Sequence, residues 1–310
     1  MNTLRVVLVA EEAAGVQTLR LLERSPHQVV AVMSGPTTGE VLRGASVGGL
    51  ARTLGYRVWP ARRVKDAALA EDLRAAGVDL LLNVHSLYLI HASVLAAPRL
   101  GAFNLHPGPL PEYAGMNAPS WAIYRGETRH GVSLHWMEAG IDTGAVAYRD
   151  DFEISEADTG LSVSAACVRR GLPLIERLLE TAARDPEAVP RWEQDVSRRR
   201  YFGRDVPQGG RLDWRAPARE VVRFVRACDY YPLPSPWGTP QTCMAGAPLG
   251  VIQAKGSGAP AAGPPGTVGE VEEGGVRVAA ADEAVLVRRV LWQGKARPAQ
   301  EVLVPGMRLH

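Results

Sequence analysis

An amide and an imidazole lie two residues apart in the stretch GAFNLHPGPLPEYAG, which spans residues 101–115. Asn104 and His106 belong to or directly follow a predicted strand, and residues i and i+2 of a strand point to the same side. An amide that donates to a developing oxyanion and an imidazole that moves a proton are a suitable pair for acyl transfer. A core histidine and a turn-capping asparagine are the alternative interpretation.

A carboxylate that could assist this pair is Asp142, in the stretch EAGIDTGAVAYRD at residues 138–150. Buried carboxylates orient catalytic imidazoles and stabilise their charged form. Asp before Thr-Gly also suits a simple hairpin turn. The residue types alone leave both interpretations open.

The elements that must position these side chains alternate between apolar runs and helical patterns. Residues 4–10, 27–35 and 78–86 are apolar runs of strand length, and helical spacing of apolar residues fills segments between them. This alternation predicts βαβ units and a Rossmann-like, doubly wound, mostly parallel sheet. In such a sheet ligands bind at the carboxyl ends of the strands, where Asn104 and His106 would lie.

The pattern changes at residue 130, where alternating residues predict a hairpin or edge strands, followed by a long helix at about residues 159–184. Residues 205–310 are mostly short strands between turns, as in a small OB-like β-barrel. We predict a catalytic domain at 1–183, a linker at 184–204 and a C-terminal barrel domain at 205–310. Gly256 to Gly266 reads as a loop within that barrel.

Composition excludes several classes of protein. The 310-residue chain has a formal net charge of +2 and no concentrated basic stripe of the kind that nucleic-acid or membrane partners favour. Its three cysteines lack C-x-x-C spacing, and its amino-terminal apolar run is too short to span a bilayer. We therefore expect a cytoplasmic protein without a membrane partner.

Motif absences narrow the choice further. The first predicted strand is followed by AEEAAGVQ instead of G-x-G-x-x-G, and neither a P-loop nor clustered Cys and His metal ligands are found. A dehydrogenase, a kinase and a zinc enzyme all become less favoured. We expect no metal.

Taken together, residues 79–95, 101–146 and 198–214, with the last 45 or so residues of the chain, resemble the folate-dependent formyltransferase family. The family includes methionyl-tRNA formyltransferase and the sugar-nucleotide N-formyltransferases. The resemblance implies formyl transfer from N10-formyltetrahydrofolate to a primary amine. It assigns oxyanion stabilisation to Asn104 and protonated His106, and support of the imidazole charge and proton relay to Asp142.

The resemblance also implies two sets of binding residues. The donor's pterin would lie against backbone groups of two loops, formed by Tyr88, Leu89 and Ile90 and by Glu138, Ala139, Gly140 and Ile141. Candidates for lining the acceptor pocket are Tyr113, Met116, Asn117, Trp121 and His135. Ordinary core packing is the alternative for each member of the second set.

Two departures from the family concern the acceptor. Ala114 stands where relatives commonly carry Arg, and Met116 stands where the sugar-nucleotide branch carries Arg, so two potential phosphate partners are missing. From Tyr201 onward, 13 basic residues face 10 acidic ones, a weak field for tRNA binding. We therefore expect a small-molecule amine acceptor: an amino acid, an amino sugar or a carrier-bound intermediate.

Several alternatives stay open at this point. A tRNA acceptor, as in methionyl-tRNA formyltransferase, is disfavoured without being excluded. Water in place of the amine would give a formyltetrahydrofolate hydrolase. A catalytically silent folate-binding protein is disfavoured because it has no chemical need for all three polar residues. The oligomeric state is open.

Overall fold

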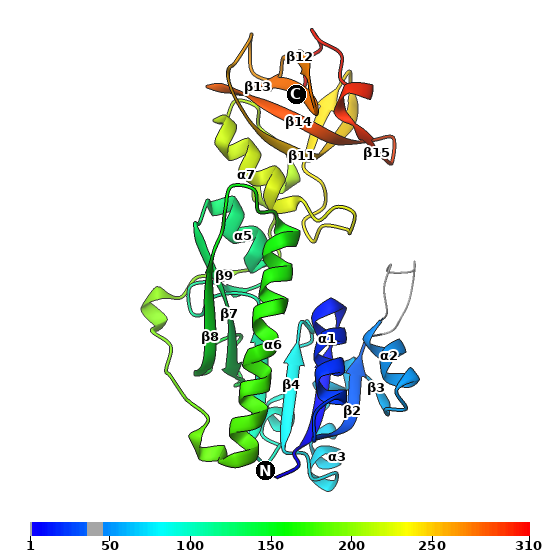
Figure 1. The fold of residues 1–310 in the computed structure, drawn as a ribbon, viewed down its shortest axis with the longest axis vertical. Helices are drawn as coiled ribbons and strands as arrows, with labels where there is room; N and C mark the ends of the chain where they lie inside the picture. The colour runs from blue at the N-terminus through cyan, green and yellow to red at the C-terminus, as the bar shows by residue number, and fades with distance from the viewer. Residues whose placement is uncertain (1, 36–45) are drawn as a thin grey trace. The chain divides into compact units, whose positions relative to one another are not determined.

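The computed structural model describes residues 2–35 and 46–310. Within these residues, one sheet contains the strands β1 Arg5–Ala10, β2 Gln28–Ser34, β3 Val58–Pro60, β4 Leu80–Val84, β5 Gly101–His106, β7 Arg129–Trp136 and β8 Val146–Glu153. Their order is β3-β2-β1-β4-β5-β7-β8 (Figure 1). Pairing is parallel from β3 through β5, whereas β7 runs antiparallel to β5.

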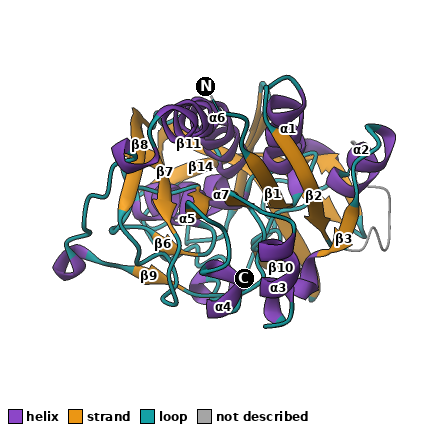
Figure 2. Cartoon of the chain, turned by 90° about the horizontal axis from the view of Figure 1, so that it is seen from below, coloured by secondary structure: helices purple, strands orange, loops and turns teal. Residues whose placement is uncertain are grey.

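Strand order reverses beside β1, which has β2 on one side and β4 on the other. Figure 2 shows β1 beside β2. The uninterrupted apolar sequences of β1 and β4 are buried nearly throughout, as expected for central strands covered on both faces. Helices that connect parallel strands must pack on these faces. The carboxyl ends of β1, β4 and β5 therefore meet at one edge of the sheet, the place where such folds bind ligands.

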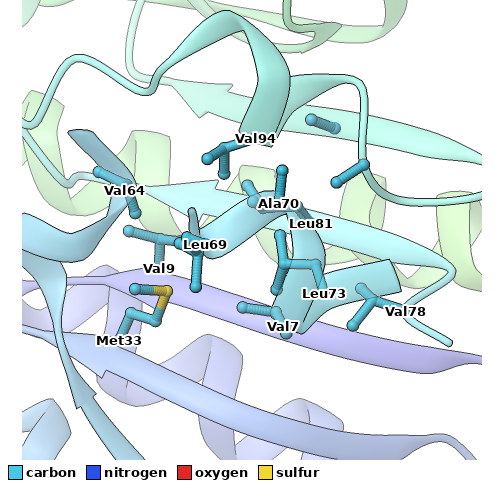
Figure 3. Packing of buried hydrophobic residues seen from close by; sticks show 12 residues of the cluster. Val7, Val9, Met33, Val64, Leu69, Ala70, Leu73, Val78, Leu81 and Val94 are labelled. Atoms are coloured by element: carbon cyan, nitrogen blue, oxygen red, sulfur yellow. The ribbon is translucent and has the colours of Figure 1, made fainter. Parts of the chain in front are cut away.

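The α-helices of the described residues are α1 Glu12–Glu23, α2 Val47–Thr53, α3 Leu69–Ala75, α4 Ala92–Leu95, α5 Ala118–Arg125, α6 Gly160–Arg184 and α7 Ala218–Cys228. Short 3-10 helices cover η1 Ala61–Lys65, η2 Pro186–Ala188, η3 Val196–Arg198, η4 Pro207–Gly210 and η5 Ala299–Glu301. An apolar cluster joins α3 and α4 to β1, β2 and β4 (Figure 3). Val7, Leu73 and Leu81 lie fully buried in it.

The carboxyl-terminal part of α6 packs on the same sheet. Cys167 lies within hydrogen-bonding range of the carbonyl of Gly131 on β7, and Tyr148 on β8 donates to Thr181. Burial raises the pKa of the Cys167 thiol well above its usual range, so this cysteine is a packing residue. The helix and the antiparallel strands agree with the patterns predicted for residues 130–184.

A second sheet follows in the C-terminal part of the chain. Its strands are β10 Gln241–Met244, β11 Ala247–Pro260, β12 Val268–Glu272, β13 Gly275–Ala279, β14 Glu283–Trp292 and β15 Lys295–Pro298. They pair in the order β10-β11-β14-β13-β12, with β15 on β14. Two bridges, Met244 to Leu309 and Thr267 to Arg308, place the chain's last residues against both β10 and the start of β12. The sheet thereby curls toward a barrel, in agreement with the predicted fold class.

The predicted loop at Gly256 to Gly266 was wrong in its first half, residues 256–260. β11 continues to Pro260, although residues from Gly256 onward read as a loop. Ser257 donates its hydroxyl to the carbonyl of Ala284 on β14, which holds this glycine-rich segment on its partner strand. Side-chain contacts of this kind leave no periodic signal in a sequence.

Two compact units divide the described chain. The first comprises residues 1–115, 131–152 and 166–201, and the second comprises 116–130, 153–165 and 202–310. The two-residue strands β6 Ala114–Gly115 and β9 Tyr201–Phe202 pair with each other. The predicted linear domain boundaries stay a prediction. No helix among residues 2–35 and 46–310 is both long enough and apolar enough to cross a membrane.

Candidate active site

A row of polar side chains crosses three neighbouring strands of the first compact unit. In the sheet register, Asn83 on β4 is the partner of Asn104 on β5, and Asn104 is the partner of His135 on β7. Each of the three side chains is at least nine-tenths buried. Buried polar groups of this kind are costly unless they bond to one another.

Asn104 lies at the centre of this row and its amide is bonded at both ends. Its Oδ1 accepts from Asn83 Nδ2 at 2.9 Å. Its Nδ2 lies 3.1 Å from His135 Nε2 and 3.4 Å from Asp142 Oδ1. His135 Nδ1 lies 2.7 Å from the carbonyl of Trp136, so that nitrogen carries the proton and Nε2 can accept from Asn104. The NH2 group of Asn104 therefore points toward Asp142.

His106 is the last residue of β5 and is buried. Its Nε2 lies 2.6 Å from the carbonyl oxygen of Tyr113, an acceptor, so Nε2 carries a proton. Its Nδ1 lies 3.5 Å from Asp142 Oδ2. Burial lowers the pKa of His106 below its ordinary value of 6.5, although the Asp142 charge and the Tyr113 carbonyl oppose this effect. Neutral imidazole is therefore the main form at neutral pH.

Asp142 joins the two halves of the site. Its Oδ2 accepts from the backbone N–H of Gly115 at 2.8 Å, and its Oδ1 lies 3.4 Å from His135 Nε2. Burial raises the pKa of Asp142, but the electrostatic effect of the neighbouring His106 and His135 imidazoles and the hydrogen bond from Gly115 N–H outweigh burial and hold this pKa below its usual range. Asp142 is therefore an ionised carboxylate facing both the imidazole and the amide.

The backbone that carries Asp142 is fixed from a distant part of the chain. Asp142 has a φ of 54°, in the left-handed region that non-glycine residues seldom occupy. Gln194 Nε2 donates to the carbonyls of Asp142 at 2.9 Å and Gly144 at 2.7 Å. Arg199 donates to the carbonyl of Ile141 at 2.9 Å. These bonds fasten the segment 190–201 to the turn and hold the carboxylate in place.

The residues expected to contact the donor lie on two loops that adjoin this network. The first follows β4: Tyr88 and Ile90 pack against the apolar cluster, whereas Leu89 is 66% exposed. The second, Glu138 to Ile141, is exposed and leads directly into Asp142. The first loop follows the strand that carries Asn83, the second ends at Asp142, and both of these residues bond to Asn104.

The residues expected to line the acceptor pocket are divided between the two compact units. His135 and the carbonyl of Tyr113 contact Asn104 and His106, as described above. Met116, Asn117 and Trp121 belong to the second unit and are each half-buried. There the indole of Trp121 packs on the rings of Phe202, Trp237 and Tyr124, with centroid distances of 4.9, 4.8 and 5.9 Å. This packing favours the core interpretation of Trp121.

Ala114, whose small side chain was used to predict the acceptor, is fully buried against Leu110 and Val146. A cation at this position would have to leave that apolar cluster. Across residues 2–35 and 46–310, no group of His, Cys, Asp or Glu side chains is arranged to hold a metal ion.

Three residues of the network were not singled out from the sequence: Asn83, Gln194 and Arg199. Asn83 has a visible signal, because it is the one polar residue in the buried run LLLNV of β4. Gln194 and Arg199 lie in a polar, turn-rich segment where neither residue differs from its neighbours. Only the folded chain brings them to Asp142.

A Rossmann-like sheet that gathers a buried amide, an imidazole and a carboxylate at its strand ends has the groups of an acyl-transfer enzyme. Residues 2–171 match the family model described as formyl transferase, and residues 206–307 match formyl transferase, C-terminal domain. The chain is 32% identical to the methionyl-tRNA formyltransferase of Anaeromyxobacter dehalogenans, over 97% of this chain and 95% of that protein. The chain therefore belongs to the formyltransferase family and is a formyl-transferring enzyme.

Solved structures agree on the fold. The N-formyltransferase from Helicobacter canadensis, in complex with folinic acid and dTDP-3-aminofucose, has a TM-score of 0.68 at 17% identity and covers 92% of this chain and 99% of its own. WlaRD, a sugar 3N-formyl transferase in the presence of dTDP and 5-N-formyl-THF, has a TM-score of 0.70 at 15% identity and covers 93% and 98%. At these identities the similarity defines the architecture alone.

Proposed function

We propose that this enzyme moves the formyl group of N10-formyltetrahydrofolate to the primary amine of a small molecule, such as an amino acid, an amino sugar or a carrier-bound intermediate. The observation that carries the proposal is that one carboxylate, Asp142, lies 3.4 Å from Asn104 Nδ2 and 3.5 Å from His106 Nδ1. These are the groups that formyl transfer to nitrogen requires: a donor to the carbonyl oxygen and a route for one proton.

The surroundings of the three residues fit a folate donor. Leu87 and Leu89 on the loop after β4, and Ile141 beside Asp142, are exposed apolar side chains suited to a pterin ring. In the same loop the buried Ser86 hydroxyl has no hydrogen-bond partner among the described residues. A flat ring rich in donors and acceptors would satisfy both features. When bound, the donor supplies the activated formyl group.

Asn104 has the role of stabilising negative charge. One N–H of its amide is directed at His135, and the other is shared with Asp142 at the long distance of 3.4 Å. That second N–H is the one available to the formyl oxygen as it gains charge. Because the amide is held at both ends, it loses little freedom when the reaction begins.

His106 and Asp142 have the role of moving the proton. The lowered pKa of His106 favours a neutral imidazole at the start, so the proton that the attacking amine loses can be taken up by the His106–Asp142 pair. Asp142 Oδ2, 3.5 Å from Nδ1, stabilises the imidazolium once it forms. The same proton then passes to the departing folate nitrogen. The protonated His106 expected from the family resemblance thus belongs to the later part of the reaction.

The choice of a small acceptor is supported by missing cations. Ala114 contributes no guanidinium and its side chain is buried, and Met116 contributes none either. The residues from Tyr201 onward carry 13 basic and 10 acidic side chains, a small excess for binding a polyanion. A second candidate, methionyl-tRNA, is favoured by the methionyl-tRNA formyltransferase that matches almost the whole chain.

A competition assay separates the two acceptors. The enzyme is incubated with N10-formyltetrahydrofolate and either methionyl-tRNA or a panel of amino acids, amino sugars and sugar nucleotides, and N-formylated products are identified by mass spectrometry. We expect a small amine to be formylated with a kcat/KM above that for methionyl-tRNA. Preferential formylation of methionyl-tRNA would replace the small acceptor with the tRNA. The His106→Ala variant is the control for enzyme-dependent product.

A further inference from the structure

Asn83 is a polar side chain in a strand whose other residues are Leu and Val, and it is 95% buried (5% exposed). On one side its register partner in β1 is Val9, and on the other it is Asn104. The polar row across the sheet therefore ends at Asn83. Because a valine or leucine would suit this strand better, the asparagine needs a reason in its contact with Asn104.

The hydrogen bonds of this row have a fixed direction. The Asp142 carboxylate only accepts, so Asn104 presents its NH2 group to it. The oxygen of Asn104 then faces Asn83, which must donate, and does so at 2.9 Å. The second N–H of Asn83 reaches the carbonyl of Ser86 at 3.4 Å, which ties the loop after β4 to the same amide.

We propose that Asn83 is a positioning residue for formyl transfer: its side-chain N–H holds Asn104 Oδ1 so that the NH2 group of Asn104 faces the reacting carbonyl. This inference rests on the proposed function. Without a donor at position 83, Asn104 Oδ1 loses its hydrogen bond on the β4 side. The amide of Asn104 is then held from one side only, by its contacts with His135 and Asp142, and its NH2 group is placed less precisely for the developing negative charge.

The test compares two substitutions that remove the donor in different ways. Asn83→Asp keeps the shape of the side chain but offers only oxygens, and Asn83→Val replaces it with the residue type found in the neighbouring β1. We expect kcat to fall about tenfold in Asn83→Val and further in Asn83→Asp, with the KM for the folate donor little changed, because misplacing a reacting group lowers the rate more than binding. The matched control is Thr18→Val, which removes one buried hydrogen bond in α1, to Ala14, away from the row.

A double-mutant cycle separates positioning from general damage. In an Asn104→Ala background, Asn83→Val should cause no further loss of kcat, because the group that it positions is gone. Losses that multiply, or wild-type kcat in both single variants, overturn the inference. Wild-type enzyme that transfers no formyl group at all would instead overturn the proposed function.

A measurement on the wild-type protein keeps the inference testable even if the Asn83 variants do not fold. The side-chain NH2 signals of Asn83, in a sample labelled with ¹⁵N at asparagine only and assigned by their contacts with neighbouring residues of β4 and β5, should exchange slowly with water. In Asn104→Ala their exchange should become faster, because their acceptor is removed. Equal exchange in the two proteins would overturn the hydrogen bond on which the inference depends.

Discussion

Two residues of the same strand, Leu81 and Asn83, face the same side of the sheet and are both buried, yet they belong to different regions. Leu81 lies in the apolar cluster with Val7 and Leu73. Asn83 begins the polar row that leads through Asn104 to His135. The apolar cluster gains free energy by excluding water, whereas the polar row must recover the cost of leaving water through hydrogen bonds.

The comparison indicates that the apolar cluster serves mainly stability and the polar row mainly activity. Replacing a buried hydrogen-bonded polar pair with apolar groups can be nearly neutral for folding, and Asn83 Oδ1 has no hydrogen-bond partner among the described residues, so stability alone does not require the polar row. Removing volume from the apolar cluster leaves a cavity that the fold cannot fill. Substitutions in the two regions should therefore affect different measurements.

The largest effect is expected in the polar row. Asn104→Ala and His106→Ala should each lower kcat about 100-fold or more, because each removes a group that acts on charge or proton transfer in the transition state. Steady-state release of tetrahydrofolate measures the rate, and thermal unfolding serves as the control. A rate close to that of the wild type in a folded variant would contradict the catalytic assignment.

The converse effect is expected in the apolar cluster. Leu73→Ala on α3 should lower the free energy of unfolding by about 2–5 kcal/mol, because this leucine is fully buried and its neighbours relax only partly. Denaturant unfolding measures the loss. The kcat per folded molecule should stay at the wild-type level; a matching loss of kcat would show that the two regions are coupled.

A smaller effect on the rate is expected at the turn that carries Asp142. Gln194→Met keeps the length of the side chain but cannot donate to the carbonyls of Asp142 and Gly144. We expect kcat to fall about tenfold, as misplacement of a reacting group by about 1 Å commonly costs up to 100-fold. Glu193→Gln, a change at the exposed neighbouring residue, is the control. Equal rates for both variants would show that Gln194 does not hold Asp142 in its catalytic position.

The smallest effect concerns pH. The pKa of buried His106 is lowered from 6.5, so below that value the unfolded state binds the proton first and the free energy of unfolding falls as the pH falls. His27 adds to the same slope, because burial lowers its pKa as well. His106→Asn should flatten the decline between pH 6.5 and lower values, at about 1.4 kcal/mol for each unit of pKa difference removed.

His27→Asn provides the comparison for this titration. This variant should reduce the dependence of the free energy of unfolding on pH and leave kcat unchanged. His106→Asn should reduce both the pH dependence and kcat. Urea unfolding at a series of pH values measures the two slopes. A decline that is the same in His106→Asn and in the wild type would mean that His106 does not titrate as its burial requires.

Much of the fold could be predicted from the sequence, because apolar runs separated by helical patterns specify a doubly wound sheet. Asn104 and His106 could be paired because their spacing is that of one strand face. The contacts of Asn83 could not, because they depend on the register between β4 and β5 and on the orientation of an amide. The burial of Ala114 was equally hidden, since a two-residue strand has no periodic pattern.

We propose, centrally, that Asn104, His106 and Asp142 catalyse the transfer of a formyl group to an amine. The most direct test is to incubate the enzyme with N10-formyltetrahydrofolate labelled with ¹³C in the formyl group, with and without a panel of primary amines. We predict that labelled N-formyl amide appears only with an amine and is lost in Asn104→Ala and His106→Ala. Labelled formate released at the same rate without any amine, or label transferred equally well by both variants, would contradict it.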